Sequence, residues 1–196
     1  MRILVIVVIT FLALFGFYGC NKRNGFIDLR ENYKSQWQQV ENQYQRRLDL
    51  IPNIVASVQG QADFEKSTLE AVINARASAT QVKLDVNNLD EASIQKYKQV
   101  QGELSSALSR LLVVSENYPN LQANQGFSEL RTQLEGTENR ISNERMKYNE
   151  AVKQYNVAIQ KVPGSFFSWG FAPATYFESE AGAEKAPGVK FDFKSK

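Results

Sequence analysis

Apolar side chains recur every three or four residues along most of the chain, a spacing that places them on one face of an α-helix. The first such stripe covers residues 26–51 and is followed directly by Pro52. Because proline lacks an amide proton and clashes with the preceding turn, we expect the helix to end or to kink there. A second stripe covers residues 54–82, with Gly60 as a weak point inside it. It predicts a second helix or a kinked continuation, since proline is favoured in a first helical turn.

Two further stripes, over residues 94–114 and 127–159, predict a third and a fourth helix. Asp90 and Ser93 precede or begin the third stripe and are suitable N-cap residues. The fourth stripe stops before the Pro-Gly pair at 163–164, which is a strong helix breaker. No run alternates with the two-residue period of a β-strand. Four long amphipathic helices joined by short polar loops predict an all-α fold, an antiparallel four-helix bundle.

The N-terminal segment is uniformly apolar rather than striped. Residues 3–18 carry no charge, Arg2 precedes them, and the polar run 21–24 follows them. A positive start before an apolar block is typical of an export signal or a membrane anchor. The block of about 16 residues is shorter than the roughly 20 residues that a bilayer-spanning helix needs.

The single cysteine, Cys20, ends this segment and directly follows the small residue Gly19. This arrangement resembles a bacterial lipobox, in which the chain is cut before the cysteine and the thiol receives a diacylglyceryl group, although Phe17 and Tyr18 are bulkier than the usual residues. We expect residues 1–19 to be a signal peptide and Cys20 to be lipidated. The alternative is that residues 1–19 are retained as a membrane anchor. Either form holds the chain at a membrane, with its bulk outside the bilayer and extracytoplasmic.

Composition then divides the rest of the chain into three segments. We expect a short tether at residues 20–25, the helical bundle at 26–162 and a mostly non-helical tail at 163–196. The tail contains eight aromatic residues, Phe166, Phe167, Trp169, Phe171, Tyr176, Phe177, Phe191 and Phe193. Because so apolar a segment is unlike ordinary disordered sequence, we expect its first part to pack on the bundle. The alternative is a patch that contacts a partner or a membrane.

The overall composition excludes several kinds of site. The 196 residues include no histidine and one cysteine, which removes Ser–His and Cys–His pairs, imidazole metal sites and internal disulfides. The 23 Lys and Arg residues against 21 Asp and Glu give a net charge of +2, too small for a typical nucleic-acid-binding domain. No glycine-rich phosphate loop follows a strand. We therefore expect no catalytic residues, no metal, no cofactor and no nucleic-acid partner.

The densest polar cluster lies at the predicted bend, where Arg46, Arg47, Asp49 and Asn53 accompany the apolar stripe. We expect Arg46 or Arg47 to pair with a carboxylate from the fourth helix and so to clamp the bend. The functional alternative is a fixed cationic site for an anionic peptide terminus or a phosphate.

The fourth predicted helix carries a polar flank beside its apolar stripe, formed by Glu135, Glu138, Arg145, Asn149 and Asn156. Half-buried polar residues of this kind often set the register between helices, provided that they are hydrogen-bonded. Glu135 and Glu138 are three residues apart, but a di-metal carboxylate site normally requires Glu-x-x-His pairs. We therefore expect the flank to fix register rather than to bind a metal.

Several blocks of sequence, in order along the chain, resemble the LemA family. They include the run QRRLDLIPNIV at 45–55 and the segments 65–72, 75–77, 116–121, 135–141, 145–152, 163–164 and 176–178. The resemblance covers about residues 24–193. A cysteine of the lipobox type is not the usual start in that family, whose members more often keep an N-terminal anchor.

The resemblance implies a membrane-anchored four-helix bundle whose biochemical role is largely unassigned. It also implies protein partners such as envelope proteases or other membrane proteins, as an analogy. We expect a non-enzymatic scaffold or adaptor of the bacterial cell envelope. The alternative is a carboxylate-dependent envelope hydrolase, or a bundle that binds an anionic ligand, at the junction of the 46–53 bend with the fourth helix.

Overall fold

A computed structural model describes residues 1–61, 64–86 and 89–177, and within these ranges the chain forms helices and irregular segments but no strand. The elements are α1 (Arg2–Gln59), α2 (Lys66–Gln81), α3 (Glu91–Ser115), α4 (Pro119–Gln122), α5 (Gln125–Gln160) and a turn of 3₁₀-helix, η1 (Gly164–Phe167). The predicted all-α fold is confirmed.

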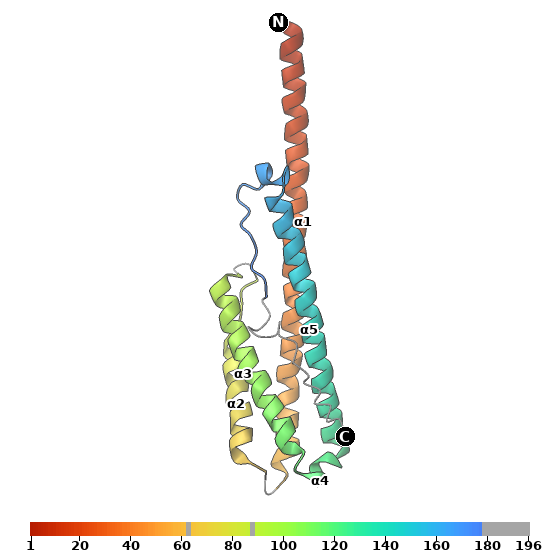
Figure 1. The fold of residues 1–196 in the computed structure, drawn as a ribbon, viewed down its shortest axis with the longest axis vertical. Coiled ribbons are helices and arrows are strands. Elements are labelled where there is room, and N and C mark those ends of the chain that lie inside the picture. The colour runs from red at the N-terminus through yellow and green to blue at the C-terminus, as the bar shows by residue number, and fades with distance from the viewer. Residues whose placement is uncertain (62–63, 87–88, 178–196) are drawn as a thin grey trace, which may run out of the picture.

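The long helices lie side by side, and each runs antiparallel to the next (Figure 1). α1 packs along α5, α2 packs along α3, and the turn η1 contacts both α1 and α5 (Figure 1). The N-terminal part of α1 projects well beyond the other helices as a single rod (Figure 1). Residues 20–25, which we expected to be a tether, are helical and belong to α1.

The chemistry of proline predicts that Pro52 ends or kinks the first helix, but the helix continues through it. α1 continues through it to Gln59 and ends at Gly60, so the second apolar stripe is shared between α1 and α2. A proline at position 52 leaves the carbonyl of Leu48, four residues earlier, without its helical amide donor. That carbonyl accepts a hydrogen bond from Arg76 Nε at 3.2 Å. A side chain from α2 therefore compensates for the missing amide.

Side-chain caps begin the two later long helices. The carboxylate of Asp90 accepts a hydrogen bond from the amide of Ser93 at 2.7 Å at the start of α3, and this bond lowers the pKa of Asp90. The side chain of Asn124 accepts a hydrogen bond from the amide of Phe127 at 3.1 Å at the start of α5. Each cap satisfies one of the amides that a helix N-terminus leaves unpaired.

Most of the buried side chains fall into two chemically different cores. The first, here called the aliphatic core, lies in the half of the bundle far from the projecting rod and includes Leu48, Ile51, Ile54, Val58, Val72, Leu104, Leu108, Leu111 and Leu134. The second, here called the aromatic core, includes Trp37, Tyr44, Tyr97, Tyr148 and Phe177. The two cores divide the length of the bundle between them.

The described part of the tail folds back along the bundle. After η1 the chain continues to Phe177, whose ring is 1% exposed within the aromatic core. Phe26, Tyr155 and Ile159 form a small cluster that Phe167 and Phe171 cover. Phe191 and Phe193 lie outside the described residues.

Candidate functional site

Arg47 lies at the boundary between the two cores and is only 1% exposed. Its guanidinium donates to Glu138 Oε1 at 2.6 Å, to Ser105 Oγ, and to both the backbone and the side-chain oxygen of Gln101. It also lies 5.0 Å from the centre of the Tyr44 ring. A buried charge is tolerated only when it is paired and hydrogen-bonded in this way.

The partners of Arg47 come from different helices at one level of the bundle. Arg47 belongs to α1, Gln101 and Ser105 belong to α3, and Glu138 belongs to α5. We call these four residues the polar layer. Because each bond requires the three helices to be aligned at that level, the polar layer specifies their register.

The polar layer has an electropositive side. A hollow of about 40 Å³ is lined by Arg47, Lys98 and Arg145, with Glu138 as the carboxylate among them. This volume accommodates about one water molecule. Burial raises the pKa of Tyr44, which also lines the hollow, while the nearby Arg145 and Arg47 act in the opposite direction.

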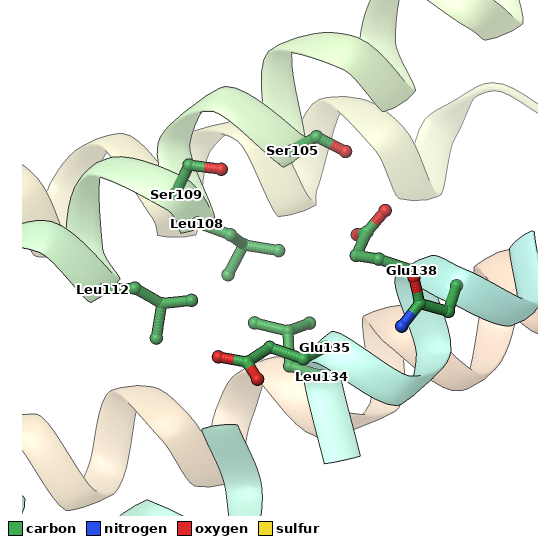
Figure 2. Close-up of a pocket in the computed structure, with 8 residues that line it drawn as sticks. Ser105, Leu108, Ser109, Leu112, Leu134, Glu135 and Glu138 are labelled. Carbon is green, nitrogen blue, oxygen red and sulfur yellow. The ribbon is translucent and has the colours of Figure 1, made fainter. Parts of the chain in front are cut away.

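A larger groove opens beside the polar layer, between α3 and α5 (Figure 2). Leu108, Leu112 and Leu134 supply its apolar side chains. Its polar side chains are Ser105, Ser109, Glu135, Glu138 and Asn139. The groove has a volume of about 470 Å³, within the usual range of ligand pockets. Figure 2 shows that the leucines and both carboxylates come from two facing helices.

The polar cluster expected at the bend is divided by the helix. Arg46, Asp49 and Asn53 are exposed on the outside of α1, whereas Arg47 points into the bundle. The carboxylate of Asp49 accepts a hydrogen bond from Gln45 Nε2 at 2.8 Å. Adjacent helical residues point about 100° apart, so of the two arginines only Arg47 reaches a carboxylate of α5.

Of the other predicted residues of α5, Arg145 and Asn149 contact the tail, and Arg145 also lines the hollow beside the polar layer. Glu135 pairs with Arg131 at 2.9 Å beside the groove. The guanidinium of Arg145 lies 4.3 Å from the centre of the Phe177 ring. Asn149 donates to the carbonyl of Phe177 at 2.8 Å and accepts from its amide at 2.7 Å. Asn149 therefore replaces the two backbone hydrogen bonds that a neighbouring strand would offer to an extended segment.

The same arrangement is repeated one heptad later, and sequence reasoning missed it. Asn156 donates to the carbonyl of Ala174 at 2.9 Å and accepts from its amide at 2.8 Å. The hydroxyls of Tyr148 and Tyr155 donate to the carbonyls of Thr175 and Ala172, at 2.8 and 3.0 Å respectively.

The sequence feature that could have indicated these contacts is the dipeptide Tyr-Asn, which occurs at 148–149 and again at 155–156. The two copies are seven residues apart and lie on one helical face. We call these the two Tyr-Asn pairs. The two pairs bind the extended backbone of the tail. Asn149 and Asn156 were instead expected to set the register between helices.

Cys20 is an exposed free thiol on α1, remote from the groove. Within the described residues, no group of three or more carboxylate, cysteine or histidine side chains is arranged to hold a metal ion. The chemistry of the groove is therefore that of an apolar floor, two carboxylates, and hydroxyl and amide groups that both donate and accept hydrogen bonds.

A model of the LemA family matches residues 36–191 of the chain. The match spans most of the helical region, including the polar layer, the groove and the two Tyr-Asn pairs, and it confirms the resemblance carried by the sequence blocks.

Similar proteins include magnetosome protein MamQ 1 and magnetosome protein MamQ 2 of Paramagnetospirillum magneticum. Each is 26% identical to this chain, over 92% of the chain and 72% of its own length. Magnetosome protein MamQ of Magnetospirillum gryphiswaldense is 26% identical over 80% of this chain and 65% of its own length.

Proposed function

The chain belongs to the LemA family, and we propose that it is a membrane-tethered, non-enzymatic scaffold of the bacterial cell envelope. The observation that carries the proposal is α1, a single helix of 58 residues. Its first part exposes an uncharged and mostly apolar series of side chains, and its last part contributes to both cores. One rigid element thus connects a segment suited to a membrane with the folded bundle.

The membrane part of the proposal rests on residues 3–18. α1 is long and apolar enough to cross a membrane, although signal sequences meet the same criterion. The names of the MamQ relatives, as magnetosome proteins, are consistent with a role at a membrane. Bundle and bilayer would then be joined without a flexible linker.

Two forms of attachment were expected, and the packing of Phe167 favours the retained helix. Its ring lies 5.1 Å from the Phe15 ring and 5.9 Å from the Tyr18 ring, measured between centres. Cleavage before Cys20 would remove both ring partners and leave Phe167 with only its contact to the cluster of Phe26, Tyr155 and Ile159. We therefore propose that residues 1–19 remain attached as an anchor and that Cys20 is not lipidated.

The scaffold part of the proposal rests on the groove between α3 and α5. Its floor is apolar, and its polar side chains are two hydroxyls, one amide and two carboxylates, which pair with Arg131 and Arg47 outside the lining and keep further acceptor lone pairs. A complementary partner segment presents an apolar side chain flanked by lysine or arginine. Protein partners of this kind include other membrane proteins and envelope proteases.

Two neighbouring residues of α3 provide a matched test. Leu112 lines the groove, whereas Val113 is exposed and does not line it. We expect Leu112→Glu to abolish capture of the partners that the wild-type chain retains from solubilised membranes, and Val113→Glu to leave capture unchanged. Circular dichroism of both variants controls for folding. Equal capture by the two folded variants would refute the groove as the binding surface.

The alternative function, a hydrolase or an anionic-ligand site, also has an observation in its favour. Glu138 is 40% exposed, is fixed by Arg47 and lines the 470 Å³ groove. A carboxylate held in this way beside an apolar floor is suited to general acid–base chemistry. A broad hydrolase screen that found turnover, lost in Glu138→Gln and kept in the exposed-site variant Glu129→Gln, would favour this function over the scaffold.

A further inference from the structure

The turn that follows α5 exposes large aromatic side chains beside the projecting rod. Trp169 is 86% exposed and Phe166 is 72% exposed. Figure 1 shows η1 against α1 at the level where the rod leaves the rest of the bundle. Exposed aromatics grouped at one place on a surface, in contrast to single ones, mark a contact with a partner or a membrane.

The exposed turn is fixed to α1 rather than loosely attached. The guanidinium of Arg23 donates to the carbonyl of Phe167 at 3.1 Å and to the carbonyl of Trp169 at 2.8 Å. At Gly19, an added Cβ would lie 2.7 Å from the Phe167 ring, so the close approach depends on glycine. The position of the turn along α1 is therefore defined.

That position coincides with the end of the apolar segment. At 1.5 Å per residue, residues 3–18 span about 24 Å, compared with a hydrocarbon core of about 30 Å. The end of the segment at Tyr18 is thus expected near one boundary of the hydrocarbon. Trp169 and Phe166 lie beside the same stretch of α1 and would reach that boundary.

The charge around the turn also fits a membrane surface. Lys22 and Arg23 follow the apolar segment directly, and Lys22 lies 5.5 Å from the centre of the Tyr18 ring. Tryptophan and other aromatics gather at the headgroup level of membranes, and each nearby lysine or arginine adds attraction to anionic lipids. Aromatic and basic groups are combined here at one level of the rod.

We propose that Phe166, Trp169, Lys22 and Arg23 form an interfacial collar that lies in the headgroup layer of a bilayer containing anionic lipids. The inference rests on the proposed membrane insertion of α1 and adds a second contact with the same membrane. Because η1 continues into the segment held by the two Tyr-Asn pairs, the collar fixes the depth and rotation of the whole bundle. The groove then faces a constant direction relative to the membrane.

The two tryptophans of the chain make the collar measurable. Trp37 is fully buried in the aromatic core, so the difference in emission between the wild-type chain and Trp169→Phe reports Trp169. Full-length protein is reconstituted into vesicles of phosphatidylcholine and phosphatidylglycerol. Lipids brominated near the headgroup or near the chain end provide shallow and deep quenchers, and iodide provides an aqueous one.

We expect Trp169 emission to shift to the blue on reconstitution and to be quenched most by the shallow brominated lipid. The same quenching should weaken in vesicles without phosphatidylglycerol, and also in Lys22→Gln relative to Lys161→Gln. Trp169 emission that is quenched by iodide and not by either brominated lipid would overturn the collar, as would strongest quenching by the deep probe. Protein that fails to float with the vesicles would instead refute the membrane tether itself.

Discussion

The two halves of the bundle are stabilised in different ways. The aliphatic core is filled mainly by leucine, isoleucine and valine, whose contacts depend on volume and have no preferred direction. In the aromatic half, Tyr148 in the aromatic core and Tyr155 in the adjoining small cluster bury their rings and direct their hydroxyls to the backbone of the tail. The first half therefore requires that space be filled, whereas the second also specifies which segment fills it.

This difference has a functional counterpart. Beside the aliphatic core, no segment of the described chain occupies the groove between α3 and α5, which remains open for a partner. At the aromatic end, the chain supplies its own extended segment up to Phe177 and carries the exposed turn near the projecting rod. Under the proposed function, one half binds other proteins and the other holds the bundle at its membrane.

The largest expected effect comes from breaking the polar layer that separates the two halves. Arg47→Ala leaves the carboxylate of Glu138 and the side chain of Gln101 without their donor and creates a cavity. We expect a loss of about 3 kcal/mol in the free energy of unfolding, at the low end for a buried pair because Glu138 is 40% exposed. Urea denaturation followed by circular dichroism measures it.

Arg46→Ala is the matched control, because Arg46 is exposed on the same turn of α1. Its effect should stay within about 0.5 kcal/mol. Equal effects of the two substitutions would mean that the polar layer does not join the two halves.

The next effect concerns only the aromatic half. The double variant Asn149→Ala with Asn156→Ala removes four hydrogen bonds to the tail backbone. We expect a loss of about 2 kcal/mol, since each net hydrogen bond contributes about 0.5–1.5 kcal/mol and released backbone groups regain water. Hydrogen exchange should show faster exchange at the amides of Ala174 and Phe177.

Protection of the amides around Leu108 and Leu134 in the aliphatic core should not change in this double variant. The exposed-site variant Asn143→Ala should leave both regions unchanged. If the double variant accelerated exchange equally in both cores, the two halves would be one cooperative unit and the comparison would fail.

The smallest effect is a difference in alkaline sensitivity. Burial raises the pKa of Tyr97 and of Tyr148 above the ordinary value of about 10. Above pH 10 the unfolded chain loses these protons while the folded chain keeps them, so stability is complete below pH 10 and falls as the pH rises further. Thermal unfolding at pH 8 and pH 11 measures the fall.

Tyr148→Phe keeps the ring and should lower stability at pH 8 by about 1 kcal/mol, through loss of the bond to the Thr175 carbonyl. It should also reduce the further fall between pH 8 and pH 11. An unchanged fall would show that the buried hydroxyl of Tyr148 does not contribute to it.

Periodicity was sufficient to predict the helices because it reflects which face of each helix is buried. It could not predict the course of α1 through Pro52, since the carbonyl of Leu48 is satisfied by Arg76 from another helix. From the sequence, either Arg46 or Arg47 could pair with a carboxylate of the fourth helix. The rotation of α1 about its own axis determines that Arg47 is the one that does so. That rotation is decided by the packing of all the helices together.

The tail illustrates a different limit. Its aromatic content predicts burial, and Phe177 is buried whereas Phe166 and Trp169 are exposed, so composition indicates neither which aromatics are buried nor where an extended segment lies. Its path depends on side-chain amides of α5 that bond to backbone groups, which every residue has in common. Such recognition leaves a pattern in the recognising helix, the repeated Tyr-Asn dipeptide, and no pattern in the segment that is recognised.

The account depends most on the claim that one unbroken helix carries the bundle from its membrane anchor, and the mass of the intact protein tests this directly. Protein extracted from bacterial membranes with detergent should have a mass that includes residues 1–19 with Cys20 unmodified; the 196 residues of the sequence alone account for 22.2 kDa. A chain that begins at Cys20 and carries a diacylglyceryl group would contradict the claim. It would show that Phe167 loses its partners Phe15 and Tyr18 when the protein matures.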